Sequence, residues 1–413
     1  MSEVNPLKPR EFLRFFWRRL TSMRTAIILL IILAIASIPG SLFPQRTQSP
    51  LKVEQYFAKH KGWAKFLDSI GFFNVFSSPW FSAIYILLFI SLIGCVFPRT
   101  LLHLKKISNL SFKEGVRESG NLLFHISLIL ILVGVAVGSL FGMKGQSIIN
   151  VGDRFVNSAS SYDSLGFGKF SSEKSLAPFS LTVTDFKAKY DVKTGAPLDY
   201  RLDADISYPI DSKPVHKVIK VNSPATYGST KIYLQANGYS PMVIIRDLKG
   251  KTTFEGAVPF LPQDGNLTST GAIKLPDMNP QIGIVATFTP TYSMSGKRGA
   301  FSSYPEALDP RLVFSVWQGN LGLDSGIPQS VYRVDTSKMV RLGLKSLKIG
   351  ESYNFNSGSI TFVGWKPWVN IEVGRDPGKD FALLGAILAI LGLLISLTLK
   401  ERDLYTSESN DSN

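Results

Sequence analysis

Four long apolar segments constrain this 413-residue chain more than any other feature of its sequence. At about 1.5 Å of rise per residue, each has the length that a helix needs to cross roughly 30 Å of hydrocarbon. None of the four contains Lys, Arg, Asp or Glu. The sequence therefore predicts an integral membrane protein with four transmembrane helices, at residues 26–43, 80–97, 121–141 and 381–399.

The distribution of basic residues predicts how the chain crosses the membrane. Basic residues are dense in the amphipathic segment 1–25 and in the short segment 98–120, whereas segment 44–79 holds five over a longer stretch. Positively charged loops stay on the cytoplasmic side. We therefore expect segments 1–25 and 98–120 and the polar tail 400–413 in the cytoplasm or stroma, and segments 44–79 and 142–380 across the membrane.

The net charge of +14 could suggest a nucleic-acid partner, but the apolar spans argue against a soluble basic protein. Anionic membrane lipids are the simpler partner, and we expect no nucleic acid. Two amphipathic segments beside the first span also fit a membrane interface. Their apolar positions at helical spacing are Phe12, Phe15, Phe16 and Leu20 on one side, and Trp63, Phe66, Leu67 and Ile70 on the other.

The remaining large segment, residues 142–380, has the pattern of β-structure. Short stretches such as "FSLTVTDFKAKY" and "IGIVATFTP" alternate apolar and polar residues and are rich in Val, Ile, Thr and Phe. Alternation with period two, interrupted by Gly, Pro, Asn and Asp, is typical of antiparallel strands. The sequence predicts a large, mainly antiparallel β-sandwich or barrel between the third and fourth spans, with residues 261–280 as a long loop.

Cysteine content and motifs exclude several classes of protein. Cys95 is the only cysteine, so the chain has no intrachain disulfide, no Cys-x-x-Cys redox pair and no Cys-x-x-Cys-His haem attachment site. We find no phosphate-binding Gly loop, no nucleophile elbow and no His-Glu-x-x-His. The chain is therefore not expected to be an enzyme by itself, and no catalytic residue is assigned.

Three of the four histidines have ordinary interpretations. His60 lies between lysines and is expected in a solvated loop, and His216 begins a predicted strand and is expected to be structural. His103 follows the second span on the basic side. It is either a plain surface residue or, as a weaker candidate, a contact to a lipid phosphate or a ligand carboxylate.

His125 is different because it stands inside the third span. An ionisable side chain in a membrane helix costs a few kcal/mol and almost always faces a partner or a cavity. One interpretation is a neutral imidazole hydrogen-bonded to a neighbouring helix. The other is an imidazole ligand to a metal or a haem iron, in which case a partner protein must supply the second axial ligand.

The segment 364–380 before the fourth span contains Trp365 and Trp368, followed by an Asp-Pro-Gly turn. Tryptophan is enriched at membrane interfaces. We expect the two indoles to form an interfacial anchor, with a platform for a flat ligand as the alternative.

Taken in order, the spans and their flanks resemble the ResB (CcsB) family of the system II cytochrome c biogenesis complex. The resemblance rests on "SMRTAIILLIILAIASIPGSLFPQ", "GFFNVFSSPWFSAIYILLFISLIGCVFPRT", "LLFHISLILILVGVAVGS" and "DPGKDFALLGAILAILGLLISL", and on the large domain that precedes the last span. It is most similar to cyanobacterial and plastid members. That implies a thylakoid or bacterial inner membrane, with the β-domain in the lumen or periplasm.

The resemblance also implies partners and a cofactor. It implies a ResC (CcsA) type membrane partner, transient haem b shared with that partner, and delivery of haem to apocytochrome c for covalent attachment. The chain would be an accessory subunit of this cytochrome c synthetase complex. His125 matches the family's membrane histidine through its "FH" context and would ligate the haem iron.

Two other functions remain open from the sequence. The chain could be a membrane-anchored assembly scaffold whose β-domain binds proteins while His125 only packs. A small-molecule transporter is the third possibility, but four spans with one buried polar group are poorly suited to alternating access.

Overall fold

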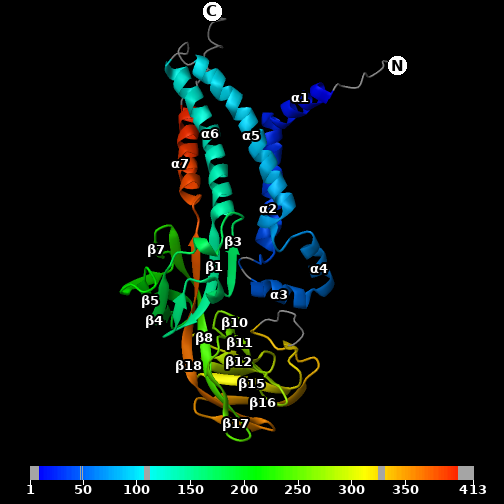
Figure 1. Ribbon diagram of the computed structural model, residues 1–413, viewed down its shortest axis with the longest axis vertical. Helices are drawn as coiled ribbons and strands as arrows, with labels where there is room; N and C mark the ends of the chain where they lie inside the picture. Colours follow the sequence, from blue (N-terminus) through cyan, green and yellow to red (C-terminus); the bar gives the residue numbers. More distant parts are fainter. Residues whose placement is uncertain (1–8, 47, 49, 107–111, 324–330, 399–413) are drawn as a thin grey trace, which may run out of the picture. The chain divides into compact units, whose positions relative to one another are not determined.

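The computed structural model describes residues 9–46, 48, 50–106, 112–323 and 331–398. The chain divides into two compact units, and each is described by itself. The helical unit comprises residues 1–142, 166–171 and 376–413, so the expected polar tail 400–413 lies outside the described residues. Its α-helices (Figure 1) are α1 Pro9–Leu20, α2 Met23–Leu42, α3 Pro50–Lys59, α4 Lys61–Ser69, α5 Pro79–Lys106, α6 Phe112–Phe141 and α7 Lys379–Thr398.

Four of these helices, α2, α5, α6 and α7, are long and apolar enough to cross a membrane, which confirms the four predicted spans. Two of them are longer than expected. α5 continues to Lys106 and α6 begins at Phe112, so most of segment 98–120 is helix rather than loop. Charged side chains ended the apolar pattern in the sequence, but Arg and Lys are good helix formers and do not end a helix.

Helices α6 and α7 pack closely because glycines face one another along both. A Cβ atom on Gly385 would lie 3.0 Å from the carbonyl oxygen of Ser127, and one on Gly392 would lie 2.6 Å from the backbone nitrogen of Phe124. Apolar association between helices is weak inside a bilayer, so close backbone approach through small residues supplies the packing. The pair holds α6 against α7 on one face and leaves another face of α6 for α5.

The segment between α2 and α5 forms a small core of its own around Phe73 and Leu67. Leu67 of α4 belongs to this core, whereas Trp63 and Phe66 of the same helix and Ile70, which follows it, are exposed. Phe12, Phe15 and Phe16 of α1 are also exposed. The placement of these aromatic residues at a membrane interface stays a prediction, and Leu67 does not belong to that exposed set.

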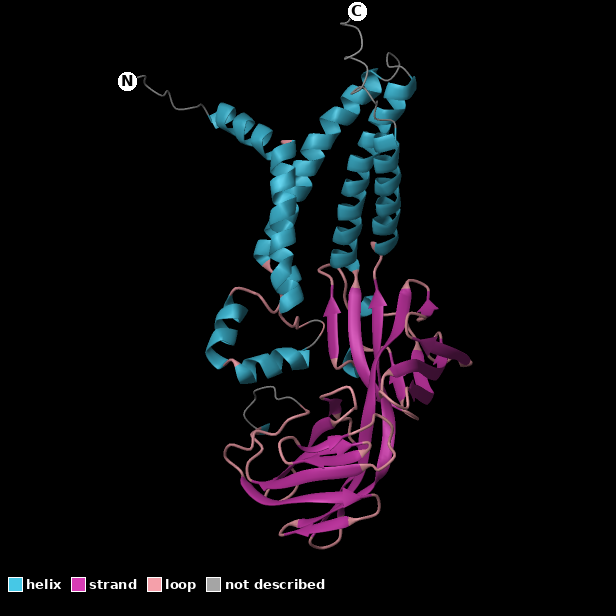
Figure 2. Cartoon of the chain, turned by 180° about the vertical axis from the view of Figure 1, so that it is seen from behind, coloured by secondary structure: helices cyan, strands magenta, loops and turns pink. Residues whose placement is uncertain are grey.

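The second unit, residues 143–165 and 172–375, is built from antiparallel sheets, as predicted (Figure 2). In the described residues, a seven-stranded sheet contains β3 Ser164–Phe167, β1 Met143–Asn150, β18 Gly358–Arg375, β8 Thr230–Asp247 and β7 Ala225–Tyr227, with β17 Ser352–Phe355 beside β18 and β9 Thr252–Ala257 beside β8. A four-stranded sheet contains β2 Arg154–Val156, β4 Ser180–Tyr190, β5 Pro197–Ser207 and β6 Val215–Lys220. A five-stranded sheet contains β10 Leu261–Pro262, β11 Ser269–Leu275, β12 Ile282–Thr289, β15 Arg311–Gln318 and β16 Val340–Lys348, and a hairpin joins β13 Tyr292–Ser295 to β14 Gly299–Ser302.

The long pair β8–β18 takes part in two cores and so makes two sandwiches that share one sheet (Figure 1). Ile360 and Phe362 of β18 pack in the core formed with the five-stranded sheet. Val369 and Ile371, further along the same strand, pack in the core formed with the four-stranded sheet. The buried positions change from even to odd numbers because β18 has a bulge between Phe362 and Gly364.

The expectation for the two tryptophans is wrong. Trp368 is 2% exposed, and its indole nitrogen donates to the carbonyl oxygens of Tyr239 and Phe260. Trp365 packs edge to face on Tyr239, with ring centroids 5.0 Å apart. Trp368 is interior to the β-unit and Trp365 is partly buried against its core, because β18 continues through this segment to Arg375 instead of ending before it.

The predicted long loop at residues 261–280 is also wrong in part. Strand β11, Ser269–Leu275, runs through its middle and pairs along its length with β12. Gly271 stands where a Cβ would meet the ring of Phe260. A glycine that disrupts the apolar pattern in the sequence thus allows the close packing of this strand.

Candidate functional site

A cavity of about 420 Å³ lies between α5 and α6 in the helical unit. Its lining residues recur at intervals of three and four along each helix, which places them on the two facing sides. Two of the chain's four histidines are among them. The lining residues are Val96, Arg99, Leu102 and His103 from α5, and Glu118, Asn121, Leu122 and His125 from α6.

His125 has a defined tautomer in this cavity. Its Nδ1 lies 2.8 Å from the backbone carbonyl oxygen of Asn121, one turn earlier in the same helix. A carbonyl oxygen only accepts, so Nδ1 carries a proton, and in the neutral imidazole this leaves the lone pair on Nε2. Neutral imidazole with a free Nε2, fixed by a carbonyl at Nδ1, is the form that ligates metals in proteins. The predicted alternative, a hydrogen bond to a neighbouring helix, is absent from the described residues.

His103 is buried, at 8% exposed, so the interpretation as a plain surface residue is wrong. Its Nδ1 lies 3.2 Å from the carboxylate of Glu118, and its Nε2 lies 3.0 Å from the hydroxyl of Ser119. Both ring nitrogens therefore have partners on α6. His103 joins α5 to α6 beside the cavity, and its nitrogens are less available to a ligand than Nε2 of His125.

Arg99 gives the cavity a positive charge. Among the described residues no carboxylate forms an ion pair with it, and its Nη1 lies 3.6 Å from the sulfur of Met23, a weak acceptor. The acid that lines the cavity, Glu118, is bound to His103 instead. Arg99 is exposed and follows the predicted span 80–97, where its guanidinium is able to form charge-assisted hydrogen bonds to an anionic group.

The chemistry of the cavity suits an anionic ligand that carries a metal. One imidazole nitrogen is free to coordinate, and one guanidinium is free to bind a carboxylate. The described residues contain no group of three or more His, Cys, Asp or Glu side chains able to hold a bare metal ion. Iron already held in a porphyrin needs only one or two protein ligands, so haem fits these residues and a free metal ion does not.

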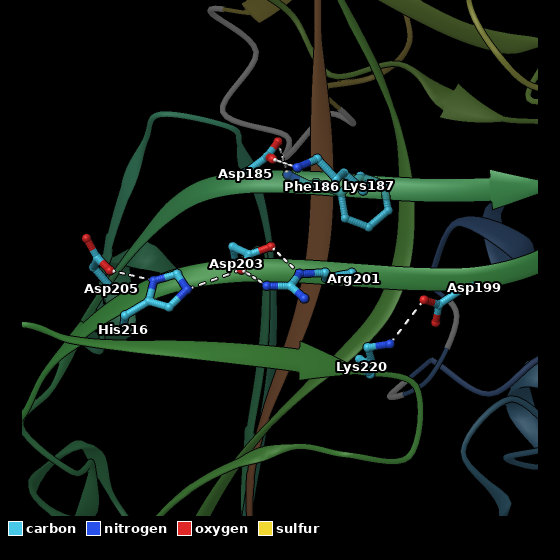
Figure 3. A network of polar contacts seen from close by, with 9 residues as sticks. All are labelled: Asp185, Phe186, Lys187, Asp199, Arg201, Asp203, Asp205, His216 and Lys220. Atoms are coloured by element: carbon cyan, nitrogen blue, oxygen red, sulfur yellow. Dashed lines mark hydrogen bonds and ion pairs between the residues drawn. The ribbon is translucent and has the colours of Figure 1, made fainter.

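The other histidines do not share this arrangement. His60 is exposed at the start of α4, as expected. His216 of β6 is half exposed on the outer side of the four-stranded sheet, where its two nitrogens lie 3.0 Å from Asp205 and 3.2 Å from Asp203 (Figure 3). Asp203 also binds the guanidinium of Arg201 with two contacts of 2.8 Å. First the hydrogen bond to Asp205 and then the one to Asp203 raise the pKa of His216.

Sequence reasoning found His125 and missed Arg99 and Glu118. Both lie in segment 98–120, which reads as a basic loop once hydropathy ends at residue 97. The signal was present in the spacing. Arg99 and His103 are four residues apart, and Glu118 precedes His125 by seven, so each pair shares a helical face once both helices are extended.

Comparison with known proteins gives a consistent set of relatives. The sequence profile of the ResB-like family matches residues 23–114 and 108–411. The cytochrome c biogenesis protein CcsB of Gloeobacter violaceus is 24% identical, over 79% of this chain and 82% of that protein. The CcsB of Nostoc sp. is 24% identical over 67% and 70%, and the CcsB of Picosynechococcus sp. is 21% identical over 96% and 87%.

Among solved structures, one of cytochrome c heme lyase CcmF matches 91% of this chain and 35% of that chain. The identity is 9% and the TM-score is 0.26, so this likeness carries no argument.

Proposed function

The chain belongs to the ResB-like family, and from that premise we propose that it is a cytochrome c biogenesis protein whose α5–α6 cavity receives haem. The curated relatives named above support the biogenesis role. The observation that carries the haem proposal is the free Nε2 of His125, which shares one cavity with the unpaired guanidinium of Arg99.

Each residue of the cavity has a distinct task in this proposal. When bound, haem b would supply an iron that takes an imidazole nitrogen as a ligand. It would also supply two propionate carboxylates, which a guanidinium can bind. His125 offers the iron its Nε2 while the carbonyl of Asn121 holds the ring in orientation. Arg99 binds a carboxylate, because a guanidinium forms strong, charge-assisted bonds to carboxylates. His103, joined to Glu118 and Ser119, keeps α5 and α6 together and is a positioning residue.

A second protein is part of the proposal, because His125 would offer a single nitrogen to the iron and both nitrogens of His103 are hydrogen-bonded on α6. We assign the second ligand to a ResC (CcsA) type membrane partner. The chain then acts as an accessory subunit, and bond formation between haem and apocytochrome c belongs to the assembled complex.

The position of His125 along α6 bears on the side of the membrane at which haem would enter. His125 lies 16 residues before the end of α6 at Phe141, or about 24 Å along the helix axis. The β-unit follows directly after that end. With the basic residues of segment 98–120 on the cytoplasmic or stromal side, haem is taken up near that side and leaves toward the β-unit in the lumen or periplasm.

The test is the visible absorption spectrum of the chain co-purified with its ResC-type partner. We expect His125→Gly to lower haem content about tenfold, and added imidazole to restore it by occupying the vacated position. His60→Gly is the matched control, because His60 is exposed and distant in sequence from the cavity. It should leave the spectrum unchanged.

The scaffold alternative makes the opposite prediction. If the assembled His125→Gly complex keeps the haem content and spectrum of the wild type, the cavity does not bind haem. The chain would then support cytochrome c biogenesis only by holding proteins together through its β-unit.

A further inference from the structure

The β-unit contains a second cavity, a cleft of about 350 Å³ near the middle of the β8–β18 pair. Aromatic residues from three strands line it, among them Tyr190 from β4, Tyr239 from β8 and Trp365 from β18. Pockets with aromatic walls and a few convergent polar groups are the usual form of a binding site. Neither the biogenesis role nor the haem proposal uses this cleft.

One carboxylate lies among these rings. Glu306 lines the cleft from the segment between β14 and β15, and no described residue forms an ion pair with it. Its backbone is fixed instead, because its carbonyl oxygen accepts hydrogen bonds from the hydroxyl of Thr291 at 2.6 Å and the backbone nitrogen of Leu308 at 3.0 Å. Lys187 also lines the cleft, but its ammonium is paired with Asp185 at 2.9 Å.

The electrostatics of the cleft are negative. Burial is the main cause that raises the pKa of Tyr239, of Tyr304 and, to about 12, of Tyr190, and the charge of Glu306 adds a smaller increase at each. Glu306, Tyr190 and Tyr239 all line this cleft. Aromatic faces carry negative potential of their own, so rings and carboxylate together favour a cation and disfavour an anion.

Tyr239 and Trp365 supply the surfaces that a cation needs. Their rings meet at 89°, so two aromatic planes form a corner. The hydroxyl of Tyr239 is already engaged, since it donates to the carbonyl oxygen of Pro305 at 2.9 Å. Tyr239 is 9% exposed and its ring also packs on Phe288, so its contribution to the cleft is the part of the ring beside Trp365.

We propose that this cleft binds a basic side chain, lysine or arginine, of an extended polypeptide, with its cation between Glu306 and the rings of Tyr239 and Trp365. The volume lies near the low end of the roughly 300–1,000 Å³ typical of small-molecule pockets, which suits one side chain with the rest of the ligand outside. Leu308 lines the same cleft and is 68% exposed, so an apolar contact is available to the neighbouring part of the peptide.

The experiment uses the full chain in nanodiscs and two unstructured Gly/Ser peptides, each with a photoreactive benzophenone residue beside the central position. One peptide has lysine at that position and the other has norleucine, which has the same shape without the charge. After irradiation, mass spectrometry locates the adducts and gives their yield. We expect the lysine peptide to label the segment around Glu306 at a yield about fivefold or more above the norleucine peptide.

Variants separate the charge from the rings. Glu306→Gln keeps the backbone hydrogen bonds of this segment and should lower the yield to that of the norleucine peptide. Trp365→Leu keeps an apolar side chain and should lower the yield by a smaller factor. Glu255→Gln is the matched control, because Glu255 is an exposed carboxylate of the same unit on β9, outside the cleft.

Four results would overturn the proposal. Three of them are equal labelling by the two peptides, an unchanged yield with Glu306→Gln, and adducts that map away from the cleft. A fourth is complete displacement of the peptide by an equal concentration of n-butylammonium, which would assign the cleft to a small free cation. None of these results depends on haem, so the cleft and the haem proposal can fail separately.

Discussion

The α5–α6 cavity and the cleft of the β-unit are similar in size and differ in the charge of one wall residue. Among the described residues, Arg99 in the cavity of about 420 Å³ has no acidic partner, and Glu306 in the cleft of about 350 Å³ has no basic one. In each, the other charged groups on the wall are already paired: Glu118 with His103, and Lys187 with Asp185. The two proposals follow this difference, with a carboxylate as the ligand of the first and a cation as the ligand of the second.

The two cavities also differ in what holds them open. The helical cavity rests on polar contacts between two helices, and α6 is fixed from behind by glycine contacts with α7. The cleft rests on a packed core around strands β8 and β18. A substitution that disrupts the packing around one cavity should therefore leave the other cavity intact. Two substitutions, one in each unit, test whether the cavities are independent.

The largest expected effect comes from Trp368→Ala. The indole is fully enclosed and holds the backbone of Tyr239, a cleft residue, through its ring nitrogen. Removing a buried indole costs about 3–5 kcal/mol. We expect the β-unit to unfold at markedly lower urea, measured by tryptophan fluorescence, with loss of lysine-peptide labelling. Haem content of the complex with the ResC-type partner should fall less than twofold, and a parallel loss of haem would show that the two cavities are not independent.

The next largest effect is expected from Gly392→Leu, which perturbs the helical cavity and should leave the cleft of the β-unit intact. Gly392 meets the backbone of Phe124 on α6, one residue before His125, and a leucine there forces the helices apart. Overpacking typically costs about 1–3 kcal/mol. Haem content should fall several-fold while peptide labelling of the cleft stays the same. Gly62→Leu is the control, because a side chain on Gly62 meets nothing within 4 Å. If Gly62→Leu lowers haem content equally, close contact with α6 is not the cause.

The sequence predicted the elements of the helical unit better than its site. Four spans follow from hydropathy alone, and His125 is conspicuous because an imidazole is rare in such a span. Arg99 and Glu118 were misplaced in a loop, because hydropathy records where apolar residues end and not where a helix ends. The partnership of His103 with Glu118 is a contact between helices that spacing within one segment does not contain.

In the β-unit the class of fold was predictable and its assembly was not. Alternation identified antiparallel strands, but the bulge after Phe362 shifts the alternation, so that one strand can enter two cores. The sequence predicts a membrane anchor at Trp365 and Trp368 because tryptophan is common at the interface beside a membrane span. Only the pairing of β18 with β8 shows that these residues are interior. The cleft at Glu306 joins three separate strands and a connecting segment, which no local pattern reports.

A charge test sharpens the comparison further. We expect Arg99→Gln to weaken binding of protoporphyrin IX by about tenfold, since a charge-assisted bond to a carboxylate is lost. The dimethyl ester of the same porphyrin has no carboxylate, so Arg99→Gln should change its binding less than twofold. Quenching of tryptophan fluorescence during titration of the complex measures both.

The other cavity supplies the control for this test. Glu306→Gln should leave both porphyrins unaffected. Loss of ester binding with Arg99→Gln would mean that the arginine supports the fold of the cavity, and equal binding of both ligands by the variant would exclude a carboxylate contact. If Arg99→Gln weakens binding to anionic lipid vesicles as much as it weakens binding to protoporphyrin IX, the guanidinium binds a headgroup phosphate.

The smallest effect is expected at His216, which has two acidic partners at an exposed surface. On the open face of the four-stranded sheet, Asp205 first and Asp203 second raise the pKa of His216, while Arg201 lowers the pKa of Asp203 (Figure 3). A raised pKa means that protonated His216 stabilises the folded state fully below the unfolded pKa near 6.5. That contribution disappears as pH rises through the folded pKa. Because the group is solvent-exposed, the gain is modest.

We therefore expect His216→Gln to lower the melting temperature of the β-unit at pH 5 and to leave it nearly unchanged at pH 8.5. Differential scanning fluorimetry of the purified chain at both pH values measures this, with His60→Gln as the control for an exposed histidine that has no acidic partner among the described residues. A larger loss at pH 8.5 than at pH 5 would reverse the sign of the linkage. The expected result, a larger loss at pH 5, would show that Asp203 and Asp205 stabilise a surface histidine, whereas Glu118 joins two helices through His103.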